Sequence, residues 1–306
     1  MIDTASPSVI HHPDIQHPEK SLEAKLAKET ASRSQFAVKF WGVRGSVPTP
    51  TAANQRYGGN TVCVEARIGD QHVIFDGGTG LVSLGYSLQQ RPDPIRAHCL
   101  FTHTQWDRIQ GFPFFQPAFA PQNRFYIHGG VAPNGASIKH CLTDQMLKPH
   151  FSMPLQNMRA SLSFHTIRDR DSFNIADIKV DVLKINANTE AMGYRLTWQD
   201  KVLVYATDTP TDAISTEFLQ FIDKADLLIY DGTYTDLTYL KSDEPGSEMQ
   251  PWEVGAKTAQ LANVKDLIFL HHSPIQSDEE LDLIQNSLSD RYPNVSIARE
   301  GMNVSI

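Results

Sequence analysis

The chain has 306 residues, enough for one large domain or two with a substantial buried core. Its composition is that of an ordinary globular protein, with 20% charged and 41% hydrophobic residues, and its formal net charge is −8. This acidity argues against bulk nucleic-acid binding, which normally uses a broad basic face. The three cysteines, Cys63, Cys99 and Cys141, have no metal-ligand spacing, and no apolar run approaches a membrane span. We therefore expect a cytoplasmic protein without membrane insertion.

The first residues, 1–35, are polar and predict an N-terminal arm ahead of a folded domain over 36–306. A short helix is expected over Ser21–Thr30, because its serine can cap the first turn and its leucines then share one face. We interpret the three histidines of the arm as solvated tail residues rather than metal ligands.

The first half of the domain alternates β-rich runs with Gly-rich turns. Gly77–Gly80 opens a helix that is expected to continue through Leu88. A Gly-rich turn between a strand and a helix can hold a phosphate, but without further motif residues it is a weak signal. The expected strands are Val38–Trp41, Val62–Ile68, His72–Asp76 and His98–Thr102.

Residues 129–165 form the least regular stretch and carry several glycines and prolines, with a helix expected over 136–147. Long irregular segments in compact domains are often lids or contact surfaces. We expect this insert to overhang the site or to join a homodimer; the alternative is a plain connecting loop.

The second half repeats the alternation of strands and helices. Two such halves imply two mixed β-sheets packed together with helices outside, an αββα sandwich of the α/β class. The expected strands are Lys179–Ile185, Tyr194–Trp198, Val202–Ala206, Leu227–Asp231 and Leu267–His271. The expected helices are Thr216–Lys224, Pro251–Ala262 and Asp278–Asp290.

The most informative segment is the loop of residues 102–108, which follows the strand ending in Cys99-Leu100-Phe101. His103 and Asp107 are plausible metal ligands at a strand end. Gln105 is a weak ligand, and Arg108 is normally none, because its guanidinium stays protonated and has no lone pair to offer.

This loop resembles the signature of the metallo-β-lactamase fold, His-x-His-x-Asp-His, and more narrowly the branch of ribonuclease Z and the cyclic phosphodiesterases. The resemblance extends from about Phe36 to the C-terminus. It includes FWGVRGSVPTP (40–50), RYGGNTVCVE (56–65), IFDGGTGL (74–81), VYATDT (204–209), LIYDGTYTD (228–236) and FLHHSP (269–274). It implies the same αββα fold, whereas the activity has to be argued from the site.

In the resembling hydrolases, histidines and carboxylates hold two metals that activate water. The resemblance places four residual ligand positions in this chain at His103, Asp107, Asp208 and His271. Asp208 matches the bridging aspartate, and His271 the final histidine.

Four other positions depart from that pattern. Gln105, Arg108 and Ala187 stand where relatives have ligand histidines, and Met249 lies near the position where relatives have a histidine that can assist proton transfer. We hypothesise that Arg108 neutralises the remaining carboxylates in place of a metal, because its planar group can bridge two of them. Asp76 and Asp231 are expected to orient neighbouring site groups through hydrogen bonds.

Three functional interpretations follow from the resemblance and its departures. The first is a catalytically inactive family member, a pseudoenzyme without a cofactor, that binds a partner protein or a small anionic ligand in the former pocket. Its ligand contacts would be Arg108, Gln105 and Arg44, although Arg44 could equally bond backbone carbonyls. The alternative is a phosphodiesterase with one divalent metal (Zn, Mn or Fe), acting on a cyclic nucleotide or an RNA 3′ end, with Asp107 and Asp208 as catalytic residues. A redox or oxygen-binding iron site is a third reading.

Overall fold

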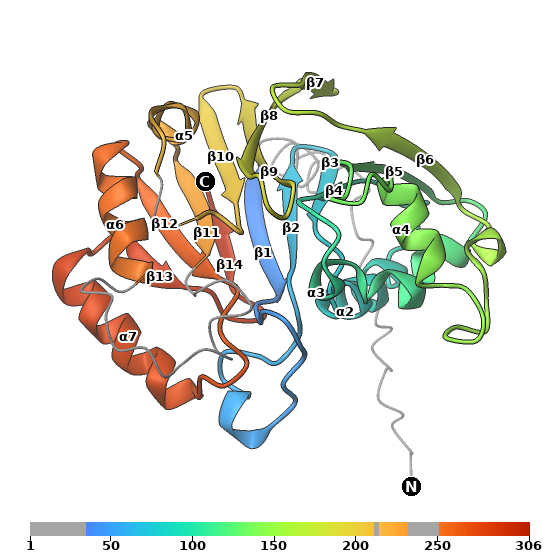
Figure 1. Cartoon of the computed structure of the whole chain (residues 1–306), viewed down its shortest axis with the longest axis horizontal. Helices are drawn as coiled ribbons and strands as arrows, with labels where there is room; N and C mark the ends of the chain where they lie inside the picture. Colours follow the sequence, from blue (N-terminus) through green and yellow to red (C-terminus); the bar gives the residue numbers. More distant parts are fainter. Residues whose placement is uncertain (1–34, 211–213, 232–250) are drawn as a thin grey trace, which may run out of the picture.

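A computed structural model describes residues 35–210, 214–231 and 251–306 of the chain. Two seven-stranded β-sheets pack face to face, with helices on the outside (Figure 1). The expected αββα sandwich of two mixed sheets is therefore confirmed. The helix expected over Ser21–Thr30 lies outside the described residues.

The first sheet has the strand order β14-β1-β2-β3-β4-β5-β6. Its strands pair antiparallel from β14 to β3 and parallel from β3 to β6. They are β1 (Phe36–Gly42), β2 (Cys63–Ile68), β3 (Gln71–Phe75), β4 (Arg96–Phe101), β5 (Arg124–Gly129), β6 (Ser161–Thr166) and β14 (Asn303–Ser305).

The second sheet has the order β13-β12-β11-β10-β9-β8-β7. It pairs parallel from β13 to β10 and antiparallel from β10 to β7. Its strands are β7 (Ser172–Ile175), β8 (Ile178–Asn186), β9 (Ala191–Trp198), β10 (Lys201–Ala206), β11 (Leu227–Asp231), β12 (Asp266–Leu270) and β13 (Val295–Ile297).

The main hydrophobic core lies between the two sheets. Apolar side chains alternate along β8, where Ile178, Val180 and Val182 are buried in that core. The rings of Phe75 on β3 and Tyr205 on β10 stack with centroids 4.5 Å apart and so join one sheet to the other. Burying side chains of this size stabilises the fold by roughly 1.5–3 kcal/mol each.

Two outer cores attach the helices to the sheets. The longest of the described helices, α7, begins with a capping box in which Ser277 and Glu280 each bond the other's backbone N–H. The helices are α2 (Gly80–Gln89), α3 (Trp106–Ile109), α4 (Ile138–Asp144), α5 (Thr216–Ile222), α6 (Pro251–Leu261) and α7 (Asp278–Arg291). Short 3₁₀ turns are η1 (Ala52–Asn54), η2 (Phe112–Phe114), η3 (Gln116–Phe119) and η4 (Leu155–Asn157).

Most expected elements are present, with bounds shifted by a few residues. The turn Gly77–Gly80 leads into a helix as expected, and α2 begins at Gly80. Gly77 N–H donates to the carbonyl of Arg108 at 2.6 Å and Gly78 N–H to that of Val62 at 2.9 Å. The glycine turn therefore holds the loop of residues 102–108 against the sheet.

The strands β6, β7, β13 and β14 were not expected from the sequence. β7, β13 and β14 span only three or four residues each, and the apolar residues of β6, Leu162 and Phe164, are only partly buried. Within 129–165, expected to be irregular, β6 forms the edge of the first sheet and α4 covers a shorter range than 136–147. A lid or dimerisation role for this insert stays a prediction.

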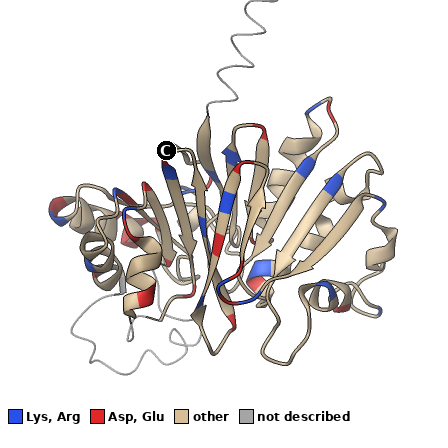
Figure 2. Cartoon of the chain, turned by 90° about the horizontal axis from the view of Figure 1, so that it is seen from above, with Lys and Arg blue, Asp and Glu red and all other residues tan. Residues whose placement is uncertain are grey.

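Charged residues of both signs are interspersed along the same strands and helices (Figure 2). Among the described residues, no helix has the length and apolar character that crossing a membrane requires.

Candidate functional site

Strand ends from both sheets meet where the sequence predicted a site. Asp76 follows β3, His103 follows β4, Asp208 follows β10, Asp231 ends β11 and His271 follows β12. Parallel strands in one sheet end at the same edge, which is where open α/β folds place their ligands.

Three of these residues have a left-handed backbone. The φ angles are 57° at Asp76, 68° at Asp208 and 65° at His271. Non-glycine residues in this region cost about 1–3 kcal/mol each and are concentrated at functional sites. Gly45 permits the close packing of His271, because a Cβ atom there would lie 2.7 Å from its Nε2.

Arg108 occupies the centre of this cluster and is fully buried. Its Nη1 lies 3.0 Å from Asp76 Oδ2, its Nε 3.2 Å from Asp107 Oδ2 and its Nη2 3.8 Å from Asp231 Oδ1. Nη1 also donates to Thr207 Oγ1 at 3.0 Å. The guanidinium therefore faces three buried carboxylates.

Asp107 is held by charges on two sides. Its Oδ2 lies 3.0 Å from His271 Nε2 as well as close to Arg108. Burial would raise the pKa of Asp107, but the charge of Arg108 and the hydrogen bond with His271 hold it well below its usual range. Burial and Arg108 lower the pKa of His271, yet Asp231 and Asp107 outweigh them and raise it. Asp107 is therefore an ionised carboxylate held between Arg108 and His271.

Asp231 contrasts with Asp107, although both are buried. Burial raises the pKa of Asp231 to about 6, because His271 and Arg108 offset only part of the desolvation and Asp208 adds a like charge. Its Oδ2 accepts the backbone N–H of Asp208. Asp231 thus bonds the backbone of a neighbouring site residue, as expected from the sequence.

Asp76 orients the loop and the arginine together. Its Oδ1 accepts from the backbone N–H of Thr102 at 2.8 Å and from the Thr102 hydroxyl at 2.9 Å. Its Oδ2 accepts from Arg108 and from the Tyr205 hydroxyl at 2.9 Å. These four donors satisfy the hydrogen-bonding capacity that burial of the Asp76 carboxylate would otherwise leave unmet.

The other two residual ligand positions are engaged by protein groups that the sequence did not single out for this task. His103 Nε2 lies 2.7 Å from Gln105 Oε1. Asp208 Oδ2 accepts from Asn186 Nδ2 at 3.1 Å and from the Thr189 hydroxyl. Asn186 precedes Ala187 in the sequence. The turn between β8 and β9 brings Asn186 and Thr189 close to Asp208.

This donor set does not fit a divalent metal. Each residual ligand position is bonded to a protein group, and the centre carries the fixed positive charge of Arg108. Within the part of the chain that the structure describes, no three His, Cys, Asp or Glu side chains are placed to hold a metal ion together. The sequence predicted that Arg108 neutralises a pocket formed by Asp107, Asp208 and Asp76. In the structure Arg108 faces Asp76 and Asp107, and its third carboxylate partner is Asp231 rather than Asp208.

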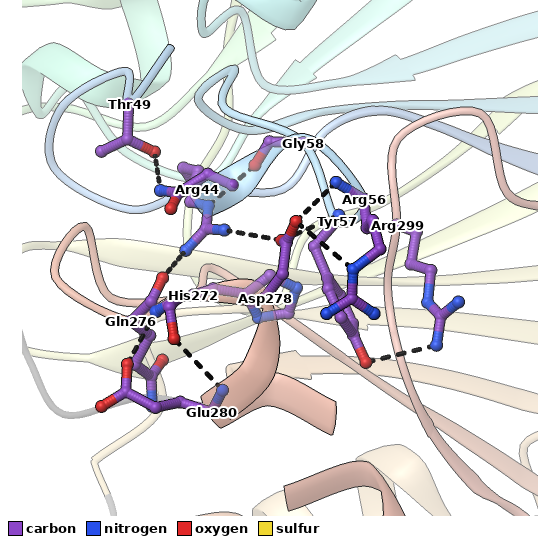
Figure 3. A network of polar contacts seen from close by, with 12 residues as sticks. Arg44, Thr49, Arg56, Tyr57, Gly58, His272, Gln276, Asp278, Glu280 and Arg299 are labelled. Atoms are coloured by element: carbon purple, nitrogen blue, oxygen red, sulfur yellow. Dashed lines mark hydrogen bonds and ion pairs between the residues drawn. The ribbon is translucent and has the colours of Figure 1, made fainter. Parts of the chain in front are cut away.

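Arg44, expected to contact a ligand or to bond backbone carbonyls, makes the second kind of contact (Figure 3). Its side chain is fully buried. Nε donates to the carbonyl of Gly58 at 2.8 Å, and Nη1 to those of Ser273 and Gln276 at 3.1 and 2.8 Å. Nη2 lies 3.8 Å from Asp278. As a ligand contact Arg44 is corrected to a structural residue, because its donors point into the fold.

We expect Arg44→Met to lower the free energy of unfolding by about 3 kcal/mol, because three carbonyls and a buried carboxylate lose their donor. Urea denaturation at pH 7 measures this. Arg56→Met is the matched control: Arg56 also contacts Asp278, but its side chain is 49% exposed, so a clearly smaller loss is expected. Equal losses in the two variants would contradict the structural role of Arg44.

Two further residues, His272 and Ala187, take no part in the cluster around Arg108. His272 is buried and its Nε2 bonds the carbonyl of Ala298 at 2.8 Å, so it does not face solvent. Ala187 is exposed in the turn after β8. Met249 lies outside the described residues.

The sequence matches the family model of the beta-lactamase superfamily domain over residues 71–272. The chain therefore belongs to this family, and its fold is the metallo-β-lactamase fold of ribonuclease Z and phosphodiesterase-like proteins. A comparison with curated protein sequences finds no match.

Several solved structures share the fold at low sequence identity. A diphosphatase of the PhnP family superposes with a TM-score of 0.64 at 14% identity, covering 89% of this chain and 97% of its own. The short form of human tRNase Z superposes with a TM-score of 0.58 at 17% identity, covering 88% of this chain and 99% of its own. Zn²⁺-bound PqqB from Methylobacterium extorquens superposes with a TM-score of 0.61 at 15% identity, covering 88% of this chain and 100% of its own. At these identities the likeness establishes the fold alone.

Proposed function

We propose that this chain is a non-hydrolytic member of the metallo-β-lactamase fold family, in which an internal ion-pair network has replaced the metal centre. The observation that carries the proposal is the position of Arg108, buried among Asp76, Asp107 and Asp231. A metal at this position would have to displace a cation that is itself paired and hydrogen-bonded.

The function we assign to the former site is recognition, of a partner protein rather than of a small anion. Arg108 and Arg44, two of the three expected ligand contacts, use their guanidinium groups inside the fold. At the surface, Gln105 is exposed beside Trp106, whose side chain is 59% exposed, and Phe114 is 52% exposed. Exposed aromatic side chains of this size are typical of protein contact surfaces.

The second candidate is a phosphodiesterase with one metal. It is favoured by the convergence of Asp107 and His271, whose oxygen and nitrogen lie 3.0 Å apart, with His103 and Asp208 at neighbouring strand ends. Arg108 would have to leave the cluster before Asp107, Asp208 and His271 could ligate zinc, manganese or iron.

Elemental analysis of the full chain, purified without tag or chelator, separates the two functions. We expect far less than one equivalent of zinc, manganese or iron per chain. We also expect no hydrolysis of bis(p-nitrophenyl) phosphate above background with any of these ions added. Stoichiometric metal together with metal-dependent turnover would overturn the proposal in favour of the phosphodiesterase.

A further inference from the structure

Three histidines line up across the parallel strands β4, β5 and β6, away from the former metal site. His98, His128 and His165 form what we call the histidine ladder. The ring centroids of His98 and His128 are 5.4 Å apart, and those of His128 and His165 are 4.8 Å apart. His98 Nδ1 lies within hydrogen-bond distance of His128 Nε2, at 3.2 Å.

The ladder connects the edges of the two sheets. His128 belongs to the first sheet, but its ring also stacks on Phe173 of β7, with centroids 4.9 Å apart and planes 4° apart. β7 is the edge strand of the second sheet, and β6, which carries His165, is the edge strand of the first. Figure 1 shows β6 running into β7 along one side of the sandwich.

The geometry of the rings excludes a shared metal. The planes of neighbouring histidines differ by only 22° and 17°. Imidazole lone pairs lie in the ring plane, so nearly parallel stacked rings cannot all aim at one ion.

The groups packed around the ladder offer no counter-charge. On β5, Tyr126 stacks on His98 with centroids 4.6 Å apart, and on β7 the contact is Phe173. Between β6 and β7, Asp171 accepts the backbone N–H of Arg168; on β8, Asp181 pairs with Lys179 and Ser172. In the described part of the chain, no carboxylate forms an ion pair with a ladder histidine.

Protonation of the ladder would therefore place like charges side by side. Burial, together with the neighbouring His165, lowers the pKa of His98 to about 4. Burial, His98 and His165 lower the pKa of His128 to about 3. A histidine whose folded pKa lies below its unfolded value stabilises the fold at high pH and loses that contribution as pH falls below the unfolded value of about 6.5.

We propose that the histidine ladder is an acid-sensitive clasp between the two sheets, whose protonation releases β6 and β7 from the sandwich. The ladder histidines take up protons when the edge strands β6 and β7 separate, because separation exposes their rings to water. The parallel strands β10, β11 and β12 carry no part of the ladder and stay paired.

Hydrogen exchange of the full chain at pH 7 and pH 5, corrected for the intrinsic rate, tests the clasp. We expect residues 161–166 and 172–175 to lose protection at pH 5, while β10 and β11 keep theirs. His128→Phe keeps the stack and removes its most buried imidazole. In this variant the fall in the folding equilibrium constant between pH 7 and pH 5, measured by urea denaturation, is expected to be about 25-fold smaller.

His140→Phe is the matched control, since His140 lies on α4 with a side chain 65% exposed; it should behave as the unaltered chain. Unchanged protection of β6 and β7 at pH 5, or a wild-type pH response in folded His128→Phe, would overturn the clasp. Should His128→Phe fail to fold, His165→Phe at the exposed end of the ladder replaces it. In His165→Phe we expect β6 and β7 to lose their hydrogen-exchange protection at a lower pH than in the unaltered chain. Loss of protection at the same pH would reject the proposal.

Discussion

Replacing Arg108 by glutamine is expected to lower the free energy of unfolding by about 3–5 kcal/mol, the usual cost of leaving a buried carboxylate without its partner. Asp107 and Asp76 would stay buried at 2% and 1% exposure while losing their nearest cation. Equilibrium urea denaturation at pH 7, with and without chelator, measures the loss. Chelator is expected to leave both proteins unchanged.

Two further variants test whether the lost positive charge of Arg108 causes the loss of stability. Adding Asp107→Asn to Arg108→Gln removes one of the two stranded charges, so we expect the double variant to recover at least about 1 kcal/mol of the lost stability. Arg124→Gln replaces an exposed arginine at the start of β5 and is expected to change stability by less than about 0.5 kcal/mol. A loss below 1 kcal/mol in Arg108→Gln, or destabilisation of the unaltered chain by chelator, would show that Arg108 is not the counter-charge of this site.

Restoring three histidines should convert the site into a metal centre. In the variant Gln105→His, Arg108→His and Ala187→His, the fixed cation is removed and three imidazoles join His103 and His271. We expect about one zinc ion per chain after dialysis against the metal, because three or four nitrogen and carboxylate ligands are what zinc requires. Elemental analysis and chelator-sensitive thermal stability report the binding.

The single variant Arg108→His is the control for that experiment. It removes the cation but leaves Gln105 on His103, so we expect weaker zinc retention than in the triple variant. A triple variant that folds and stays metal-free would mean that Asn186 and Thr189 have reshaped the surroundings of Asp208 beyond recovery. Equal metal content in the unaltered chain would contradict the non-hydrolytic function.

Local residue patterns were sufficient for the long elements and insufficient for the edges. Buried runs such as Leu227–Asp231 coincide with their strand, because continuous apolar sequence and flanking turns specify it locally. β6 and β7 escaped prediction because edge strands are partly exposed and owe their pairing to a neighbouring strand. The histidine ladder escaped with them, since His98, His128 and His165 are 30 and 37 residues apart in the sequence.

By itself, the sequence determined the αββα class, the family and the strand ends at which the site lies, because these depend on the identity and order of residues along the chain. It also determined that Arg108 and Gln105 stand in the signature loop. Only the tertiary structure decided which groups these side chains meet: Arg108 faces Asp231 rather than Asp208, and Arg44 turns inward to backbone carbonyls. The physical reason is that a buried charge takes whichever partner the packing of distant segments brings within about 4 Å, and local sequence does not encode that distance.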